Sequence, residues 1–289
     1  MIGVAPRDIL SPENYVAMAS KCRTENQINR LHIKLECDLT PGEIFELENL
    51  SRAGLLNQAA REWLDKLESF NRELFIAPEP FLRSSIGPNV SLYRNPDHPP
   101  KNKTLLLAFS GNGRRLGLPI CVFLQSLDSR VFDVVVFKKG SDKRPYLEGI
   151  EGFSDSLPRA LKLIRRATSQ RSFTRTITLG TSSGGFPALV TAVLFGAEAG
   201  FSICGYPPSS PPNLGLRCQL AVRRLFSRPP HMEFVYGTPV DQKNAALLQG
   251  YFGGTTRHVD VSQHNLLGAL LLRGELTQFL DGLFVVKPI

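Results

Sequence analysis

Apolar and polar positions follow one pattern through most of the chain. From about residue 90 to the C-terminus, short apolar runs alternate with longer segments in which apolar residues recur every three or four positions. The short runs indicate buried strands, and the longer segments indicate amphipathic helices. This alternation predicts an α/β fold with a mostly parallel central sheet and helices on both faces. The clearest helical segments are residues 117–127, 156–168, 184–197, 242–249 and 266–284.

The N-terminal part has a different pattern. Residues 13–38 and 43–74 are polar with helical periodicity, which predicts an N-terminal helical region over residues 1–76. Four residues have the spacing of one tetratricopeptide-like helix pair: Leu50, Gly54, Ala59 and Trp63. An ordinary amphipathic pair of helices would explain them as well. A single pair cannot bury its own apolar face, so it must pack on the rest of the chain or on a protein partner.

Proline marks the boundary between the two parts. Six prolines fall within residues 77–100, which predicts a linker. Residues 101–289 would then form the α/β domain.

The sequence Gly-x-Ser-x-Gly occupies residues 180–184, between a strand-like run and a helix-like segment. A chain that turns directly from a buried strand into a helix needs strained backbone angles, and the two glycines leave room for the turn. Ser182 would lie exposed at its tip, as a nucleophile. The backbone N–H of Ser183 beside it could stabilise an oxyanion. Ser183 is the weaker candidate nucleophile, because only Ser182 has glycine both two residues before it and two residues after it.

At this motif the chain resembles the α/β-hydrolase superfamily. In that superfamily an acid and then a histidine follow the nucleophile along the chain. Asp241 follows the strand-like run at residues 232–237, and His264 follows the run at residues 256–261. The resemblance therefore implies a catalytic triad of Ser182, Asp241 and His264, with a covalent acyl-enzyme at Ser182.

Alternatives remain for two of these roles. Asp241 could instead cap a helix, and Asp260 competes for the role of the acid, although it falls inside the last strand-like run. His264 is the one histidine of five in a loop between a late strand and a final apolar helix. A solvated loop histidine is the competing interpretation.

A second glycine-rich loop follows the apolar run at residues 104–109. The resemblance implies that this loop donates another oxyanion N–H, from Gly111, Asn112 or Gly113. Arg114 and the arginine after it would favour an anionic substrate, unless they form a solvated surface pair. The same glycines approach a dinucleotide-binding fingerprint, but their spacing differs and no acidic residue ends the next strand.

The resemblance also places a lid over the active site at residues 206–230, which begin with a proline-rich stretch. A lid would govern which substrates enter. A stiff surface connection is an equally good interpretation.

Composition limits the kinds of partner and the cellular location that we expect for the protein. The 289 residues carry a net charge of +8, but the chain has no zinc-finger pattern, RNA-binding aromatic motif or basic helix, so we expect no nucleic-acid partner. Five cysteines without a C-x-x-C pair suit a reducing compartment and argue against a structural zinc site. The start of the chain lacks the features of a signal peptide, so we expect a cytoplasmic location. The apolar segment at residues 186–206 is better explained by a buried helix and strand than by a membrane span.

The sequence therefore predicts a serine hydrolase that acts on an ester or thioester of a small-molecule or carrier-linked acyl group. No metal ion or organic cofactor is expected, because the triad and backbone donors suffice. Two alternatives stay open: an acyltransferase with the same triad, and a non-catalytic protein that binds a partner through its N-terminal helices.

Overall fold

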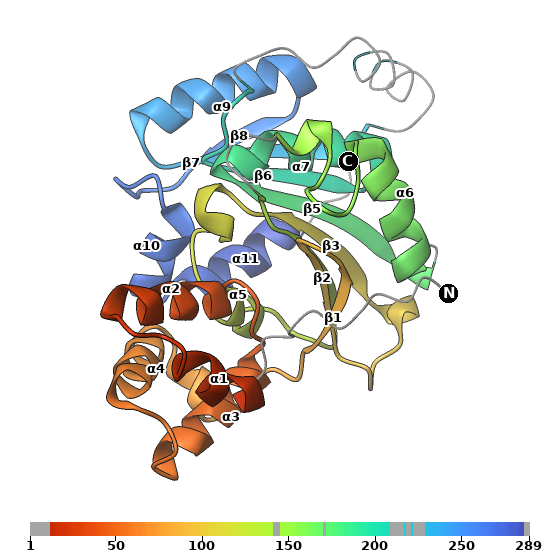
Figure 1. Cartoon of the computed structure of the whole chain (residues 1–289). Helices are drawn as coiled ribbons and strands as arrows, with labels where there is room; N and C mark the ends of the chain where they lie inside the picture. The colour runs from red at the N-terminus through yellow and green to blue at the C-terminus, as the bar shows by residue number, and fades with distance from the viewer. Residues whose placement is uncertain are drawn as a thin grey trace.

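A single mixed sheet forms the centre of the protein (Figure 1). The computed structural model describes residues 12–140, 145–169, 172–208, 217, 221 and 229–285. Within these residues the sheet has eight strands in the order β1-β2-β4-β3-β5-β6-β7-β8. The strands are β1 (Leu82–Gly87), β2 (Val90–Arg94), β3 (Thr104–Phe109), β4 (Phe132–Phe137), β5 (Arg175–Thr181), β6 (Ala199–Ile203), β7 (His231–Tyr236) and β8 (Thr255–His258).

Most of the sheet is parallel. Strands β3 to β8 pair in parallel with one another, and β2 is antiparallel to both of its neighbours, β1 and β4. The carboxyl ends of the parallel strands therefore share one edge, where loops can bring distant side chains together.

Helices cover both faces of the sheet. Those of the α/β part are α5 (Ile120–Gln125), α6 (Leu157–Thr168), α7 (Gly185–Phe195), α9 (Pro239–Phe252), α10 (Leu266–Leu272) and α11 (Leu276–Phe284). In β3, Leu106 and Ala108 belong to one apolar cluster with α5 and α11, and Leu105 and Leu107 belong to the other with α6 and α7. This alternation buries the strand on both sides, which is why its sequence is a continuous apolar run. The predicted α/β class, with a mostly parallel sheet and helices on both faces, is confirmed.

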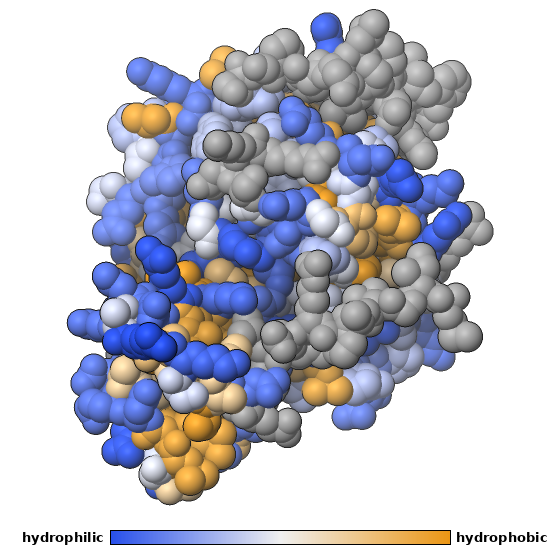
Figure 2. All heavy atoms as spheres, in the orientation of Figure 1, coloured by the Kyte–Doolittle hydropathy of each residue, from blue (hydrophilic) through white to orange (hydrophobic). Residues whose placement is uncertain are grey.

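The N-terminal helices share the core of one sheet face. They are α1 (Pro12–Ala19), α2 (Glu25–Glu36), α3 (Pro41–Arg52) and α4 (Gln58–Phe70). Leu35, Ile44 and Trp63 are buried in the same cluster as α5 and the sheet. The apolar face of these helices therefore packs on this chain. Figure 2 shows apolar side chains gathered at the far end of this helical region, and Leu55, in the loop between α3 and α4, is 61% exposed.

The structure differs from the sequence prediction at residues 77–100. The segment expected to be a linker contains β1 and β2, which extend the sheet at one edge. Its prolines lie outside the two strands, at the turn and the flanks, where no ladder hydrogen bond is lost. The prolines around β1 and β2 therefore led the sequence analysis to predict a linker where two short strands lie.

The predicted helix at residues 266–284 is two helices, α10 and α11. Gly274 lies between them with φ 72°, a left-handed conformation that glycine adopts without strain and that ends a helix. The predicted helix at residues 242–249 is longer, because Thr238 caps α9 and Pro239 begins it.

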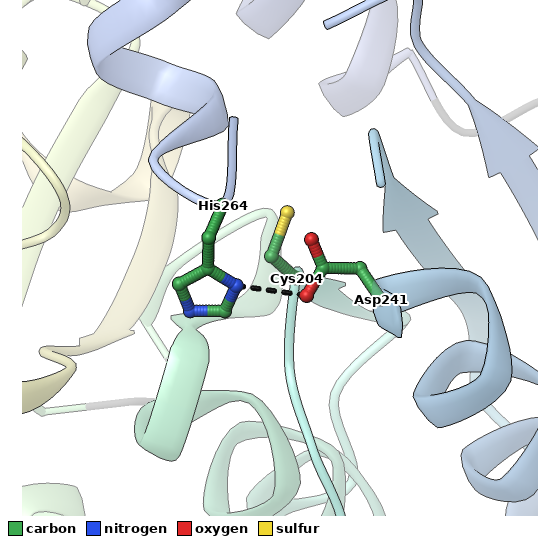
Figure 3. A group of neighbouring side chains, drawn as sticks. All are labelled: Cys204, Asp241 and His264. Carbon is green, nitrogen blue, oxygen red and sulfur yellow. Dashed lines mark hydrogen bonds and ion pairs between the residues drawn. The ribbon is translucent and has the colours of Figure 1, made fainter. Parts of the chain in front are cut away.

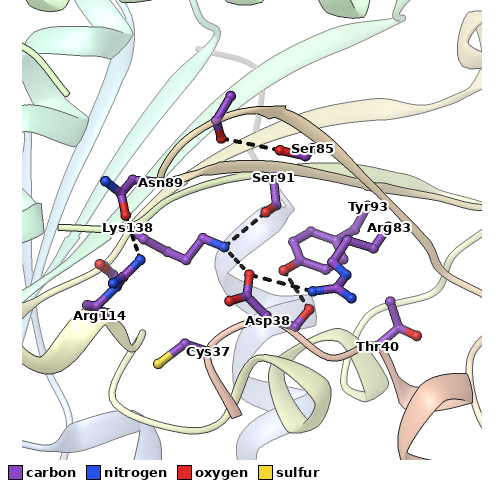
Figure 4. A network of polar contacts seen from close by, with 12 residues as sticks. Cys37, Asp38, Thr40, Arg83, Ser85, Asn89, Ser91, Tyr93, Arg114 and Lys138 are labelled. Atoms are coloured by element: carbon purple, nitrogen blue, oxygen red, sulfur yellow. Dashed lines mark hydrogen bonds and ion pairs between the residues drawn. The ribbon is translucent and has the colours of Figure 1, made fainter. Parts of the chain in front are cut away.

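A buried polar network joins the N-terminal region to the sheet (Figure 4). Asp38, between α2 and α3, forms an ion pair with Lys138, which follows β4. Lys138 also donates to Ser91 Oγ at 2.9 Å, and Tyr93 Oη donates to the Asp38 carbonyl at 2.9 Å. Burial lowers the pKa of Lys138, and Asp38 opposes that shift. The charge on Lys138 therefore depends on Asp38.

We expect Asp38→Ala to lower the free energy of unfolding by about 3–5 kcal/mol, because it leaves the Lys138 ammonium buried without its partner. The Lys138 side chain is only 5% exposed. Urea denaturation measures the change. Glu48→Ala is the matched control, because its partner Arg52 is 60% exposed, and it should cost less than about 1 kcal/mol. Equal losses in the two variants would contradict the role assigned to Asp38.

Candidate active site

The turn from β5 into α7 presents Ser182. A short 3-10 turn, Ser182–Gly184, joins the two elements, and Ser182 has φ 50°, a left-handed value that is strained for a serine. A Cβ on Gly180 would lie 2.0 Å from the Gly184 carbonyl oxygen, and a Cβ on Gly184 would lie 2.3 Å from the Phe109 carbonyl oxygen. Both positions therefore require glycine, as expected from the sequence motif.

The three side chains expected to act together do lie together. His264 Nε2 is 3.0 Å from Ser182 Oγ, and His264 Nδ1 is 2.8 Å from Asp241 Oδ1. The Asp241 side chain is 2% exposed, whereas that of His264 is 51% exposed. A buried carboxylate thus orients a histidine that reaches the serine from the solvent side.

Two residues that the sequence analysis did not identify lie beside the Asp241 side chain: Thr238, and Cys204, which Figure 3 shows next to it. Thr238 Oγ1 donates to Asp241 Oδ2 at 2.7 Å and caps α9, so Asp241 lies in the first helical turn and is not the cap itself. The thiol of Cys204, just after β6, lies beside the carboxylate, and burial raises its pKa to about 12. The threonine at the start of α9 is a capping signal that the sequence contains. Nothing in the sequence marks Cys204.

Cys204, Asp241 and His264 also have the residue types of a metal site. Their ligand atoms all lie within 4.8 Å of one another. The Asp241–His264 hydrogen bond engages two of these three groups, and burial raises the pKa of the Cys204 thiol. A cation bound here would have to replace that hydrogen bond and displace the thiol proton.

Asp260, the alternative acid, lies elsewhere. It follows β8, which ends at His258, and its side chain is exposed. Its backbone carbonyl accepts a hydrogen bond from Arg273.

His32, another histidine of the chain, is buried and stacks on Trp63, and burial lowers its pKa to about 4.

The loop after β3 faces the Ser182 turn. A Cβ on Gly111 would lie 3.1 Å from Ser182 Cβ, so the two backbones approach closely. The Gly111 N–H donates to the Arg115 carbonyl at 3.0 Å and is therefore not available to a substrate. Ser183 Oγ donates to Asn112 Oδ1 at 3.1 Å, which ties the two loops together. Ser183 is the second residue of its short 3-10 turn and Asn112 is the first residue of its own, so neither N–H has an acceptor within the turn.

A cavity of about 510 Å³ opens beside Ser182. The residues that line it are Gly111, Asn112, Arg115, Leu116, Gly117, Thr181, Ser182, Ile203, Tyr206, His264, Asn265, Leu266 and Leu267. Gly113 and Arg114, both expected at the site, are not among them. Arg114 instead donates to Asn89 Oδ1 at 2.5 Å. The arginine at the cavity is Arg115.

The expected lid, residues 206–230, lies mostly outside the described residues. Tyr206, its first residue, lines the cavity. None of the helices in the described part of the chain has the length and apolar character needed to span a bilayer.

No protein-family model and no curated protein matches this sequence. Solved structures do match it. An α/β serine hydrolase without lid from Xanthomonas campestris is 17% identical, covering 73% of this chain and 98% of its own, with a TM-score of 0.45. Esterase B from Lactobacillus rhamnosis is 14% identical, covering 77% of this chain and 95% of its own, with a TM-score of 0.42. Independently of these matches, the mostly parallel sheet and the strand-to-helix turn at Ser182 have the form of an α/β-hydrolase-like fold.

We expect Gly180→Ala to lower the free energy of unfolding by about 1–3 kcal/mol, because the new methyl group collides with the Gly184 carbonyl. Thermal or urea unfolding measures the loss. Gly250→Ala, within α9, is the matched control: no other group lies within 4 Å of the new Cβ, and alanine favours a helix by up to about 1 kcal/mol. A Gly180→Ala protein as stable as the parent would refute the steric account of the turn.

Proposed function

We propose that this chain is a serine hydrolase that cleaves an ester or thioester through a covalent acyl-enzyme at Ser182. The observation that carries the proposal is the continuous path of hydrogen bonds from Asp241 through His264 to Ser182, 2.8 Å and 3.0 Å long. This path ends at the mouth of the 510 Å³ cavity. A hydroxyl, an imidazole and a buried carboxylate in this order are the groups that acyl transfer needs.

The chemistry follows from these contacts. His264 Nε2 takes the proton of Ser182 Oγ as that oxygen attacks the substrate carbonyl. The N–H groups of Ser183 and Asn112 donate to the oxyanion that forms. His264 then gives the proton to the leaving oxygen or sulfur, which leaves Ser182 acylated. Water, deprotonated by His264, attacks the acyl-enzyme and releases the acid. Asp241 accepts from Nδ1–H and so fixes the tautomer in which Nε2 can receive a proton.

The walls of the cavity support an acyl substrate. Leu116, Ile203, Leu266 and Leu267 supply apolar surface beside Ser182. An apolar chain gains free energy by leaving water for such a surface. Transfer of the acyl group to an acceptor other than water would use the same three side chains. The protein would then be an acyltransferase instead of a hydrolase.

Labelling with a fluorophosphonate tests the proposed nucleophile. We expect one adduct per chain, on the peptide that contains Ser182, and none in Ser182→Ala, because only an activated hydroxyl displaces fluoride readily. Intact-protein and peptide mass spectrometry measure it. Ser183→Ala is the matched control and should still be labelled. A folded protein that takes up no label would instead favour a non-catalytic role.

Asp241→Asn should lower kcat by about 10⁴-fold, because the amide favours the wrong histidine tautomer. Ester hydrolysis in a pH-stat measures the change. Asp260→Asn removes the same charge from an exposed position and should leave kcat within about twofold of the parent. The reverse pattern would reassign the acid.

A further inference from the structure

Arg115 is the one permanently charged residue among the described residues that line the cavity. It follows the loop that faces Ser182, and its side chain is 31% exposed. A free guanidinium at this position would attract an anionic group on the substrate. Its partners therefore decide which acyl groups the cavity accepts.

The partner of Arg115 comes from the N-terminal helical region. Glu36, the last residue of α2, places Oε2 2.6 Å from an Arg115 Nη atom. Its other oxygen, Oε1, accepts a hydrogen bond from Trp63 Nε1 at 2.9 Å. Both carboxylate oxygens are engaged and the Glu36 side chain is only 12% exposed, so it is held against Arg115.

Helix stability does not explain this glutamate. An acidic side chain at the C-terminal end of a helix is disfavoured by the helix dipole. Trp63 and Arg115 stabilise it there instead. The result is a cavity wall whose only permanent charge, among the described residues, is neutralised.

We propose that Glu36 is a specificity-determining residue, which neutralises Arg115 and makes the cavity select uncharged acyl groups over acyl groups with a terminal carboxylate. The proposal rests on the proposed function and replaces the anionic substrate expected from the sequence. It also gives the N-terminal helical region a part in substrate choice: without Glu36, Arg115 would bind a substrate carboxylate through charge-assisted hydrogen bonds.

The test compares two esters of equal chain length, methyl hexanoate and monomethyl adipate, at pH 7. In Glu36→Gln the ratio of kcat/KM for the adipate ester to kcat/KM for the hexanoate ester should rise roughly tenfold over the parent, the effect of one charge-assisted contact. A pH-stat measures both rates. Because the two esters are compared within one protein, a loss of folded material changes both rates equally and leaves the ratio unaffected.

Three controls isolate the charge of Arg115. Glu36→Gln combined with Arg115→Gln should return the ratio to that of the parent, and Arg115→Gln alone should lower it below the parent, because Glu36 then has no counter-ion and repels the substrate carboxylate. Glu48→Gln removes an equal charge from an ion pair on α3 whose arginine is 60% exposed, and should keep the parental ratio. An unchanged ratio in an active Glu36→Gln protein would overturn the proposal.

Binding gives the same comparison without turnover. Calorimetric Kd values for N-methylhexanamide and for the mono-N-methylamide of adipic acid should show the same roughly tenfold shift in Glu36→Gln. If the parent protein hydrolyses neither ester but Glu36→Gln still shifts the Kd ratio, the proposed function is refuted and the role of Glu36 remains. A Kd ratio that does not shift in Glu36→Gln would refute that role.

Discussion

The direct turn from β5 into α7 is the constraint on which the rest of the site depends. It places Ser182 at a left-handed backbone angle, which only the missing side chains of Gly180 and Gly184 make possible. The same close packing brings the loop after β3 against the turn. The parallel strands β7 and β8 deliver Asp241 and His264 to the same edge of the sheet. Ser182, Asp241 and His264 are thus brought together at one edge of the sheet, with the loop after β3 packed against the Ser182 turn.

The N-terminal helical region belongs to this arrangement. Its apolar residues belong to the core on the sheet face that α5 and α11 cover, and Asp38 forms an ion pair with the buried Lys138, which follows β4. Glu36, two residues earlier, reaches the cavity wall through Arg115. The end of α2 and the connection that follows it therefore carry two ion pairs to the α/β part of the chain, at Glu36 and at Asp38. Through this ion pair the N-terminal helical region contacts a cavity that is lined by residues between Gly111 and Leu267.

Much of this could be predicted from the sequence. The apolar run at residues 104–109 located β3 to the residue, because a strand buried on both faces is a continuous apolar run with clear ends. The order of Ser182, Asp241 and His264 was sufficient to place them together. Contacts between distant surfaces could not be predicted: Glu36 with Arg115 and Asp38 with Lys138 join segments about 80 and 100 residues apart, which no local pattern records. Strands β1 and β2 were missed because proline at their flanks resembles a linker, and Arg114 was expected at the cavity because sequence does not show which of two neighbouring arginines points inward.

The convergence of Ser182 with its two backbone donors is the central claim, and a crystal structure of the protein after reaction with a phosphonate ester tests it most directly. The account predicts phosphorus bonded to Ser182 Oγ, with one phosphonyl oxygen within hydrogen-bonding distance of the N–H groups of both Ser183 and Asn112. An adduct on another side chain, or a phosphonyl oxygen turned away from both N–H groups, would contradict it.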